Sequence, residues 1–137
     1  MAKFESEQVI IPASAATVFE FLSDFRNFEN LMPSQISNWE ADGDTCSFTI
    51  EGLAGLSMRI AGRTPYTNVH IVSEGKNPVE YTLDCFLQPD GEDRCKASLE
   101  FDAALNPFMK MVASRPLQNF VNMLAEKLQQ HFQQASE

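Results

Sequence analysis

Few side chains in this chain could transfer a proton or attack a substrate. The two histidines are His70 and His131, and the three cysteines are Cys46, Cys85 and Cys95. Imidazole acts as a general acid or base near neutral pH and a thiolate acts as a nucleophile, but each needs a partner beside it in a pocket. Catalysis is therefore indicated only if other polar residues converge on these groups.

Neither histidine has neighbours that indicate catalysis. His70 stands between Val69 and Ile71, so it faces solvent if those two apolar side chains face the core. His131 falls in a glutamine-rich stretch close to the end of the chain, where a solvated side chain is expected. We therefore assign no catalytic role to either histidine.

The cysteines form an odd set without a C-x-x-C spacing, which is typical of reduced, buried thiols. A disulfide between Cys85 and Cys95 across a hairpin is the less favoured alternative, because cross-strand geometry strains such a bond. Motifs of cofactor chemistry are missing too, since Gly52-Leu53-Ala54-Gly55 lacks the third glycine of a phosphate-binding loop. We expect no metal and no cofactor.

The charged residues of the central part of the chain share one parity. In the alternating segments, the polar side carries Arg59, Glu51, Asp84, Glu100 and Asp102. Carboxylates that work as an acid–base pair must point into a pocket, and this parity points them outward. A catalytic set is therefore not indicated, and enzymatic activity stays open with ligand binding preferred.

An ordered succession of elements must position these residues. Residues 3–11 predict a strand that ends at Pro12. Ser14 can cap a helix and Asp24 a second, short one, which must end near Pro33 because the residue before a proline disfavours helical geometry. Two short helices in tandem are therefore expected after the first strand.

Residues 35–104 alternate between apolar and polar side chains, and turn residues divide them into six strands. The turns are predicted at Asp42-Gly43-Asp44, Gly52–Gly55, Thr64-Pro65, Gly75-Lys76-Asn77-Pro78 and Pro89-Asp90-Gly91. Such alternation means that one face of the sheet is covered and the other is wet.

A long amphipathic helix follows the last strand. Asn106 is a suitable cap and Pro107 a suitable first helical residue. Beyond residue 116 the apolar side chains fall within an arc of about 120° at about 100° per residue. Because a proline inside a helix costs a hydrogen bond, we expect a break or kink at Ser114-Arg115-Pro116.

The start of the chain resembles a known group of proteins. It reads Ile10-Ile11-Pro12-Ala13-Ser14-Ala15-Ala16-Thr17-Val18-Phe19-Glu20-Phe21-Leu22-Ser23-Asp24, followed by Phe28 and Met32-Pro33. This pattern is similar to that of the helix-grip superfamily (SRPBCC), which includes START lipid-transfer domains, birch-pollen-allergen-like proteins and aromatic polyketide cyclases. The resemblance and the order of elements imply an α+β, helix-grip fold, with a seven-stranded, curved antiparallel sheet wrapped on the long C-terminal helix.

The same resemblance implies an internal cavity for a small hydrophobic molecule such as a lipid, isoprenoid or polycyclic aromatic. Its wall is predicted from inward parity on the strands and from the apolar face of the helix. The wall residues are Phe48, Ile50, Met58, Ile60, Tyr81, Leu83, Leu99, Phe101, Phe120 and Leu124. Tyr81 has the one polar tip among them, and a ligand oxygen is a candidate partner for it.

We expect the cavity to open between Gly52–Gly55 and the apolar segment around Met111, with Arg115 near enough to bind an anionic head group. Two other functions remain alternatives. A cyclase or dehydratase acting on a hydrophobic substrate needs at least two titratable groups inside the cavity. An interaction module has a filled core, with no cavity above about 300 Å³.

Composition limits the partners. The 137 residues, 44% of them hydrophobic, suit a single helix-grip domain over 1–137. The net charge is −9 and the basic residues are scattered, so neither nucleic acid nor an anionic membrane surface is an expected partner. Neither a signal sequence nor a membrane-spanning stretch is recognisable. We therefore expect an acidic cytoplasmic protein, either a monomer or a homodimer.

Overall fold

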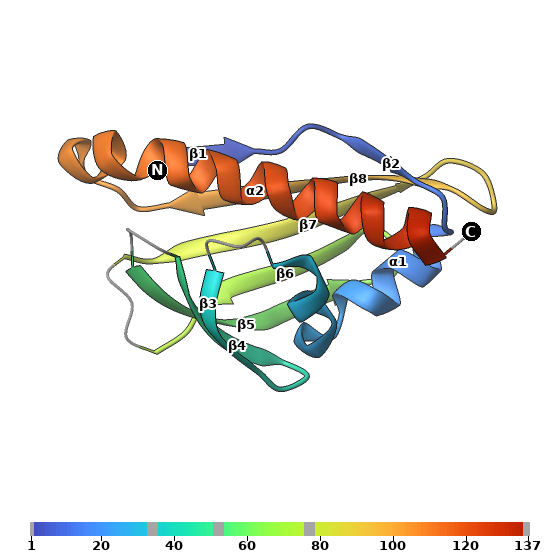
Figure 1. Cartoon of the computed structure of the whole chain (residues 1–137), viewed down its shortest axis with the longest axis horizontal. Coiled ribbons are helices and arrows are strands. Elements are labelled where there is room, and N and C mark those ends of the chain that lie inside the picture. The colour runs from blue at the N-terminus through green and yellow to red at the C-terminus, as the bar shows by residue number, and fades with distance from the viewer. Residues whose placement is uncertain (1, 33–35, 51–53, 76–78, 136–137) are drawn as a thin grey trace.

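One antiparallel sheet and one long helix dominate the computed structural model, which describes residues 2–32, 36–50, 54–75 and 79–135 (Figure 1). The strands are β1 (Ala2–Glu5), β2 (Val9–Ile11), β3 (Ile36–Ala41), β4 (Thr45–Ile50), β5 (Ala54–Thr64), β6 (Asn68–Ser73), β7 (Tyr81–Pro89) and β8 (Cys95–Ala103). The helices are α1 (Ala15–Leu22), the 3₁₀ helix η1 (Phe25–Leu31) and α2 (Pro107–Ala135). This order confirms the predicted α+β fold, with two short helices ahead of six strands and a long final helix.

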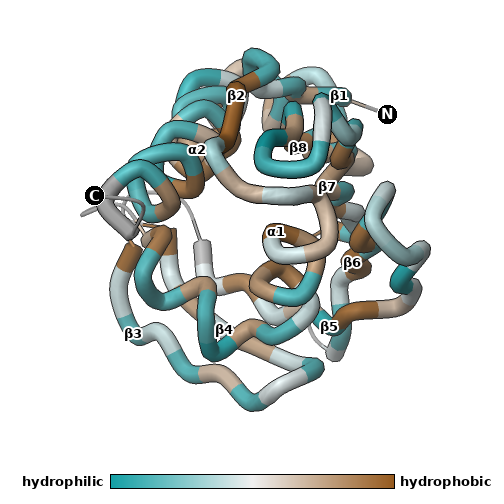
Figure 2. Tube along the Cα trace, turned by 90° about the vertical axis from the view of Figure 1, so that its right-hand side faces the viewer, coloured by the Kyte–Doolittle hydropathy of each residue, from teal (hydrophilic) through white to brown (hydrophobic). Residues whose placement is uncertain are grey.

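The sheet has the strand order β1-β8-β7-β6-β5-β4-β3, and β2 also pairs with β8. Consecutive strands from β3 to β8 are antiparallel neighbours, as expected for a series of hairpins. In the end-on view of Figure 2 the strands follow an arc, α2 lies across its opening, and α1 covers the end nearest the viewer. The curvature of the sheet thus creates an inner face that α2 covers.

The first predicted strand is split in two. Between Phe4 and Val9 the N-terminal segment advances five residues, while their partners on β8 are only four residues apart. The irregularity falls at Ser6, whose hydroxyl accepts a hydrogen bond from the Leu99 N–H at 2.9 Å. An extra residue of this kind interrupts the ladder and bends the strand. It raises the strand count from the predicted seven to eight among the described residues.

Side-chain caps begin both short helices, as predicted. The Ser14 hydroxyl accepts a hydrogen bond from the Thr17 N–H at 3.2 Å. The Asp24 carboxylate accepts one from the Arg26 N–H at 2.9 Å. Met32, the residue before a proline, has extended geometry and ends η1. The two helices are therefore defined by local residues that the sequence already displays.

Of the break or kink predicted at Ser114-Arg115-Pro116, a break is not found, because α2 continues through these residues. Proline has no N–H, so the carbonyl of Val112 loses its usual helical partner. Val112 is 53% exposed, so this residue lies on the side of the helix away from the core. The predicted start of the helix is confirmed, because the Asn106 side chain accepts a hydrogen bond from the Met109 N–H at 2.8 Å.

The core lies between the inner face of the sheet and α2. Burial alternates along the whole of β8, which confirms the predicted division into a covered face and a wet face. At one end, η1 contacts both α2 and β3. Its Phe25 and Phe28 are fully buried, with ring centroids 5.1 Å apart. The short helices therefore close one end of the wrapped sheet.

Candidate ligand-binding site

The inner face of the sheet and one face of α2 provide the predicted wall. All ten predicted wall residues are buried, with at most 8% of any one exposed. They are Phe48, Ile50, Met58, Ile60, Tyr81, Leu83, Leu99, Phe101, Phe120 and Leu124. Every second residue of a strand and every third or fourth residue of a helix share a face, which is why the pattern assigned them correctly. Their contact with a ligand remains a prediction.

Two aromatic pairs define the packing of this inner face. The ring of Phe48 on β4 lies 5.7 Å from that of Phe120 on α2, at 25° between their planes. The rings of Tyr81 on β7 and Phe101 on β8 lie 5.0 Å apart at 15°. Ring pairs at these centroid distances are favourable. The first pair joins α2 to a distant part of the curved sheet, and Trp39 extends it, 5.7 Å from Phe48.

Tyr81 has the one polar tip among the ten wall residues, and this tip has a partner within the protein. The Tyr81 hydroxyl donates a hydrogen bond to the carbonyl of Ser57 on β5 at 2.8 Å. The same carbonyl accepts a hydrogen bond from the Glu74 N–H at 3.0 Å. Burial raises the pKa of Tyr81 above its ordinary value, so the phenol keeps its proton. The partner of Tyr81 is therefore the main chain of the sheet rather than the ligand oxygen suggested by the sequence.

Among the described residues, the buried titratable groups are limited to the Tyr81 phenol and three thiols. No buried side chain there is a carboxylate, amine, guanidinium or imidazole. The three cysteines are free, as predicted. Burial raises the pKa of Cys46 and of Cys85 to about 12, and it raises the pKa of Cys95 too, so the thiolate is disfavoured. Nor do the described residues include a cluster of His, Cys, Asp or Glu that could hold a metal ion.

The two residues predicted to line the cavity mouth do not face the interior. Met111 is 74% exposed, and Arg115 is exposed one turn further along α2. Ala113 and Leu117 face inward instead, because the packed face of the unbroken helix continues through this segment. The place of Met111 and Arg115 beside a cavity mouth stays a prediction. Residues 51–53, part of the predicted opposite side of the mouth, lie outside the described residues.

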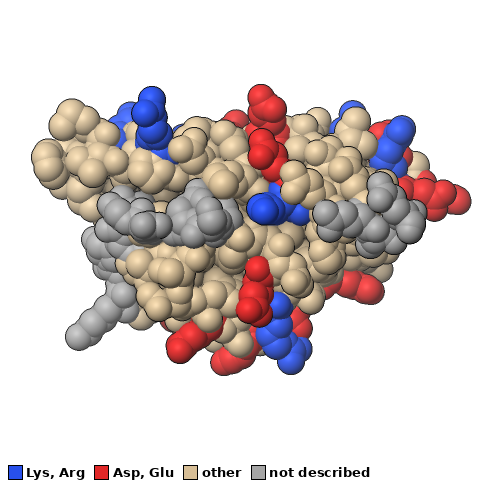
Figure 3. Space-filling model, viewed as in Figure 1, with Lys and Arg blue, Asp and Glu red and all other residues tan. Residues whose placement is uncertain are grey.

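The charged residues of the strands lie on the outer face, as their parity predicted, and charges of both signs are spread over the surface in Figure 3. Lys3 pairs with Glu100 at 2.9 Å. His70 shares this face: its Nδ1–H donates a hydrogen bond to the Asp84 carboxylate at 2.7 Å, and 40% of its side chain is exposed. His70 therefore faces away from the interior, as predicted. Glu51 lies outside the described residues.

The second histidine does not follow its prediction. The ring of His131 packs on that of Phe21 in α1, with centroids 4.6 Å apart, and it also contacts Phe132 at 5.1 Å. Its side chain is half-buried rather than solvated. The glutamines around His131 gave no sign of this contact, because the partner ring comes from near the other end of the chain.

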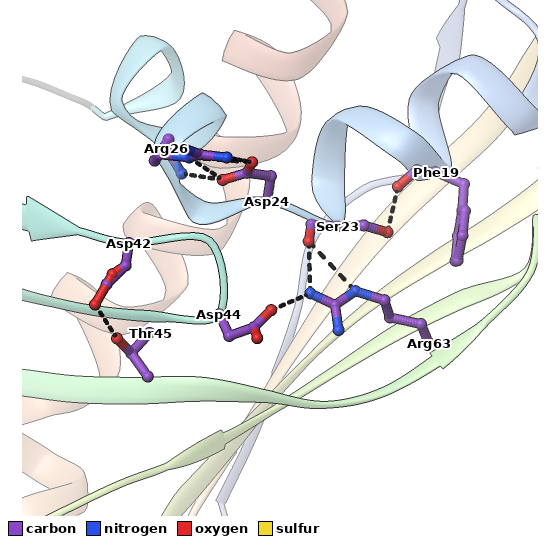
Figure 4. Close-up of polar contacts among 8 residues, drawn as sticks. All are labelled: Phe19, Ser23, Asp24, Arg26, Asp42, Asp44, Thr45 and Arg63. Atoms are coloured by element: carbon purple, nitrogen blue, oxygen red, sulfur yellow. Dashed lines mark hydrogen bonds and ion pairs between the residues drawn. The ribbon is translucent and has the colours of Figure 1, made fainter.

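Polar contacts hold the short helices against the sheet at the closed end (Figure 4). Arg63 of β5 donates hydrogen bonds to the Ser23 carbonyl at 2.7 Å and to the Asp44 carboxylate at 2.6 Å. Beside it, the Arg26 guanidinium donates to the Asp24 carboxylate at 2.6 Å. Hydrogen bonds from the Arg26 side chain are the main cause that lowers the pKa of Asp24 to about 2. The charged groups at this end are thus engaged with each other and with the main chain.

The described residues also form a hollow on the outer face of β3, β4 and β5. Its volume is about 550 Å³, and it is lined by Asn38, Glu40, Ser47, Phe48, Thr49, Gly55, Leu56 and Ser57. The outward side chains in this set are hydroxyls, an amide and a carboxylate, since outward parity on these strands is polar. Such a lining is unlike the predominantly apolar walls of small-molecule cavities. The hollow is therefore a poor match to an apolar ligand.

Some side chains of the inner face were missed from the sequence. Leu56 is buried and has the same parity as Met58, so the pattern contained a usable signal for it. Trp39, which packs on the core, had no such signal. The register of β3 shifts between Ser37 and Glu40, and alternation fails across a shift of this kind.

The sequence profile of one protein family matches residues 1–135, and that family is described as "Polyketide cyclase / dehydrase and lipid transport". The chain belongs to this family. The matched residues include every described strand, both short helices and α2. The whole fold described above therefore belongs to the polyketide cyclase/dehydrase and lipid transport family. No curated protein sequence gives a significant match.

Solved structures confirm the helix-grip fold of this polyketide cyclase/dehydrase and lipid transport family member. A START superfamily protein from Mycobacterium smegmatis has a TM-score of 0.71 and 16% identity, over 97% of this chain and 98% of that chain. Truncated norcoclaurine synthase from Thalictrum flavum has a TM-score of 0.71 and 13% identity, over 95% and 92%. The di-domain ARO/CYC BexL from the BE-7585A biosynthetic pathway has a TM-score of 0.73 and 13% identity, over 98% of this chain and 47% of that chain. At these identities the likeness establishes the fold alone.

Proposed function

We propose that this protein binds a small, largely apolar molecule between the inner face of the sheet and α2, and carries it without transforming it. The composition of the inner face is the observation that carries this proposal. Nine of the ten buried wall residues have hydrocarbon or thioether side chains. Removing apolar surface from water contributes roughly 25 cal/mol of favourable free energy per Å². Such a wall therefore favours binding of a lipid, isoprenoid or polycyclic aromatic. The description of the family, which includes lipid transport, supports a ligand of this class.

Carriage is preferred to catalysis because the described part of the inner face holds no buried carboxylate, amine, guanidinium or imidazole. Cyclisation and dehydration require groups that add or remove protons at the substrate. Tyr81 is the single candidate among the ten wall residues; burial raises its pKa, and its hydroxyl is bonded to Ser57. The printed names of two structural neighbours, a norcoclaurine synthase and an ARO/CYC protein, keep cyclase-type catalysis as the alternative.

Native mass spectrometry of freshly purified, detergent-free protein tests this proposal. We expect a discrete added mass that acid denaturation releases as an apolar organic molecule. Stripped protein should take the molecule up again and return it chemically unchanged after long incubation. Recovery of a converted product would favour the enzyme, and the lack of both a bound molecule and saturable binding of a hydrophobic dye would contradict the carrier.

A matched pair of variants locates the binding site. Leu124→Trp adds bulk to the buried face of α2, whereas Asn119→Trp adds the same side chain to an exposed position of that helix. Overpacking costs roughly 1–3 kcal/mol, which a folded variant can tolerate and which thermal unfolding will report. The bound fraction should fall in Leu124→Trp and stay unchanged in Asn119→Trp.

A further inference from the structure

A second apolar surface lies on α2, on the side away from the core. Phe108, Met111 and Val112 are 69%, 74% and 53% exposed. Residues at positions i, i+3 and i+4 share one face of a helix, and Arg115, at i+7, continues the same row. These four residues, Phe108, Met111, Val112 and Arg115, are called the outer patch of α2.

The outer patch is confined to the first turns of the helix. Further along the same row stand Asn119, Asn122 and Glu126, all of them polar. On the opposite side of the first turns, Ala113 and Leu117 are only 5% and 3% exposed. The beginning of α2 is therefore apolar on two opposite sides, and the fold buries just one of them.

The outer patch also differs in charge from the rest of the protein. The chain has a net charge of −9, yet Lys110 and Arg115 are the only charged residues between Asp102 and Glu126. Neither forms an ion pair with a described residue. The outer patch thus combines exposed apolar groups with an uncompensated cation.

We propose that the outer patch docks the protein on a phospholipid membrane, with Phe108, Met111 and Val112 inserted at the acyl boundary and Arg115 on the lipid phosphates. Interfacial helices bury an apolar face about 5–10 Å into this boundary and place basic side chains at the level of the head groups. α2 begins at one end of the molecule, where its first turns can reach a flat surface (Figure 1). No described helix is long and apolar enough to cross a membrane, so the contact is superficial.

The size of the outer patch argues against a protein partner. A stable protein interface needs about 800 Å² on each side, whereas three side chains of this kind offer on the order of 400 Å². A bilayer does not require shape complementarity, and a few inserted side chains suffice for reversible attachment. Because the basic residues are scattered along the sequence, an anionic membrane was not an expected partner. The fold, however, places exposed apolar groups and Arg115 on one face of α2. This surface is separate from the inner face to which the proposed function refers.

Vesicle flotation tests the docking directly. The probe is a suspension of phosphatidylcholine vesicles with a minor fraction of phosphatidylglycerol, and ligand-free protein should float with it. The double variant Phe108→Ser, Met111→Ser should bind at least roughly tenfold more weakly, because two exposed apolar side chains are lost. Both positions are mostly exposed, so circular dichroism and thermal unfolding should match the wild type. Phe86→Ser is the control: Phe86 is 40% exposed on β7, and its loss should leave flotation unchanged.

A second pair of variants tests the cation. Arg115→Glu and Lys127→Glu make the same change in net charge, but Lys127 lies near the other end of α2. Only Arg115→Glu should weaken vesicle binding. Insertion is measured with Phe108→Trp, whose emission, after subtraction of the Trp39 signal, should shift to the blue and be quenched by brominated lipids. Phe86→Trp should show neither change.

The proposal is overturned if wild-type protein fails to float, or if the Phe108→Ser, Met111→Ser variant floats equally well. It is also overturned if that variant dissociates a dimer in the absence of vesicles, because the outer patch would then bind a second copy of the chain. Ligand binding is measured separately by native mass spectrometry. A carrier that ignores vesicles and a membrane-bound protein without ligand are therefore distinguishable outcomes.

Discussion

Replacing Phe120 with alanine should destabilise the protein far more than the same replacement at Phe108 on the same helix. Phe120 is 1% exposed, and its ring is stacked on that of Phe48 at a centroid distance of 5.7 Å. Truncating a buried phenylalanine costs about 3–5 kcal/mol, from lost burial and from the cavity left behind. At about 3–5 °C per kcal/mol for a chain of this size, Tm should fall by about 9–25 °C.

Phe108→Ala is the matched control, because Phe108 is 69% exposed and its truncation should change the free energy of unfolding by less than about 0.5 kcal/mol. Urea unfolding followed by circular dichroism measures both values, with equal m-values as the check on a common two-state transition. Similar losses in the two variants would refute the assignment of the two faces of α2. A loss below about 1 kcal/mol for Phe120→Ala would refute the packing of this helix on β4.

Three further results are expected. The Tyr81 hydroxyl bonds to the main chain of β5, so Tyr81→Phe should lower the free energy of unfolding by about 1 kcal/mol and leave ligand affinity unchanged. A marked loss of affinity would show that the hydroxyl contacts the ligand. Hydrogen bonds from Arg26 lower the pKa of Asp24 from 3.8 to about 2, so this stabilisation is complete above pH about 4 and is lost as the pH falls through 2. The difference in unfolding free energy between wild type and Asp24→Asn should therefore shrink over that range in urea titrations, and a pH-independent difference would contradict this. Burial raises the pKa of Cys46 and of Cys85 to about 12. A thiol reagent at mildly alkaline pH should therefore label these two residues in urea but not in the folded protein. Rapid labelling without urea would show that the strands carrying them open readily.

The fold was predictable because its signals are local and repeated. Alternation along β4, β7 and β8 assigns each side chain to a face. A one-residue shift in the register of a strand would move its whole row of apolar side chains to the solvent face. Ser14, Asp24 and Asn106 display their capping roles in the sequence, since each bonds to an N–H two or three residues ahead.

The failures share a different physical cause. A break or kink at Pro116 was expected from helix chemistry alone, but the helix does not break, and Ala113 and Leu117 are packed in the core on both sides of the proline. Met111 and Arg115, predicted beside a cavity mouth, lie exposed on the outer face of this helix. The partners of Tyr81 and His131 come from distant segments, so no local pattern could name them.

Ligand identity is not encoded in the same way. A wall that lines a ligand and a core that fills itself use the same apolar side chains with the same periodicity. The parity of Leu83 or Leu99 therefore identifies the inner face without specifying what it contacts.

Methyl NMR of ligand-free protein titrated with anilinonaphthalene sulfonate tests the central claim most directly. If the inner face binds apolar molecules, the methyl signals of Leu83, Leu99 and Leu124, all buried there, should shift saturably, while the amides of Ser47 and Thr49 beside the outer hollow stay unchanged. Shifts confined to the outer hollow or to the outer patch of α2, with the three inner leucines unmoved, would contradict it.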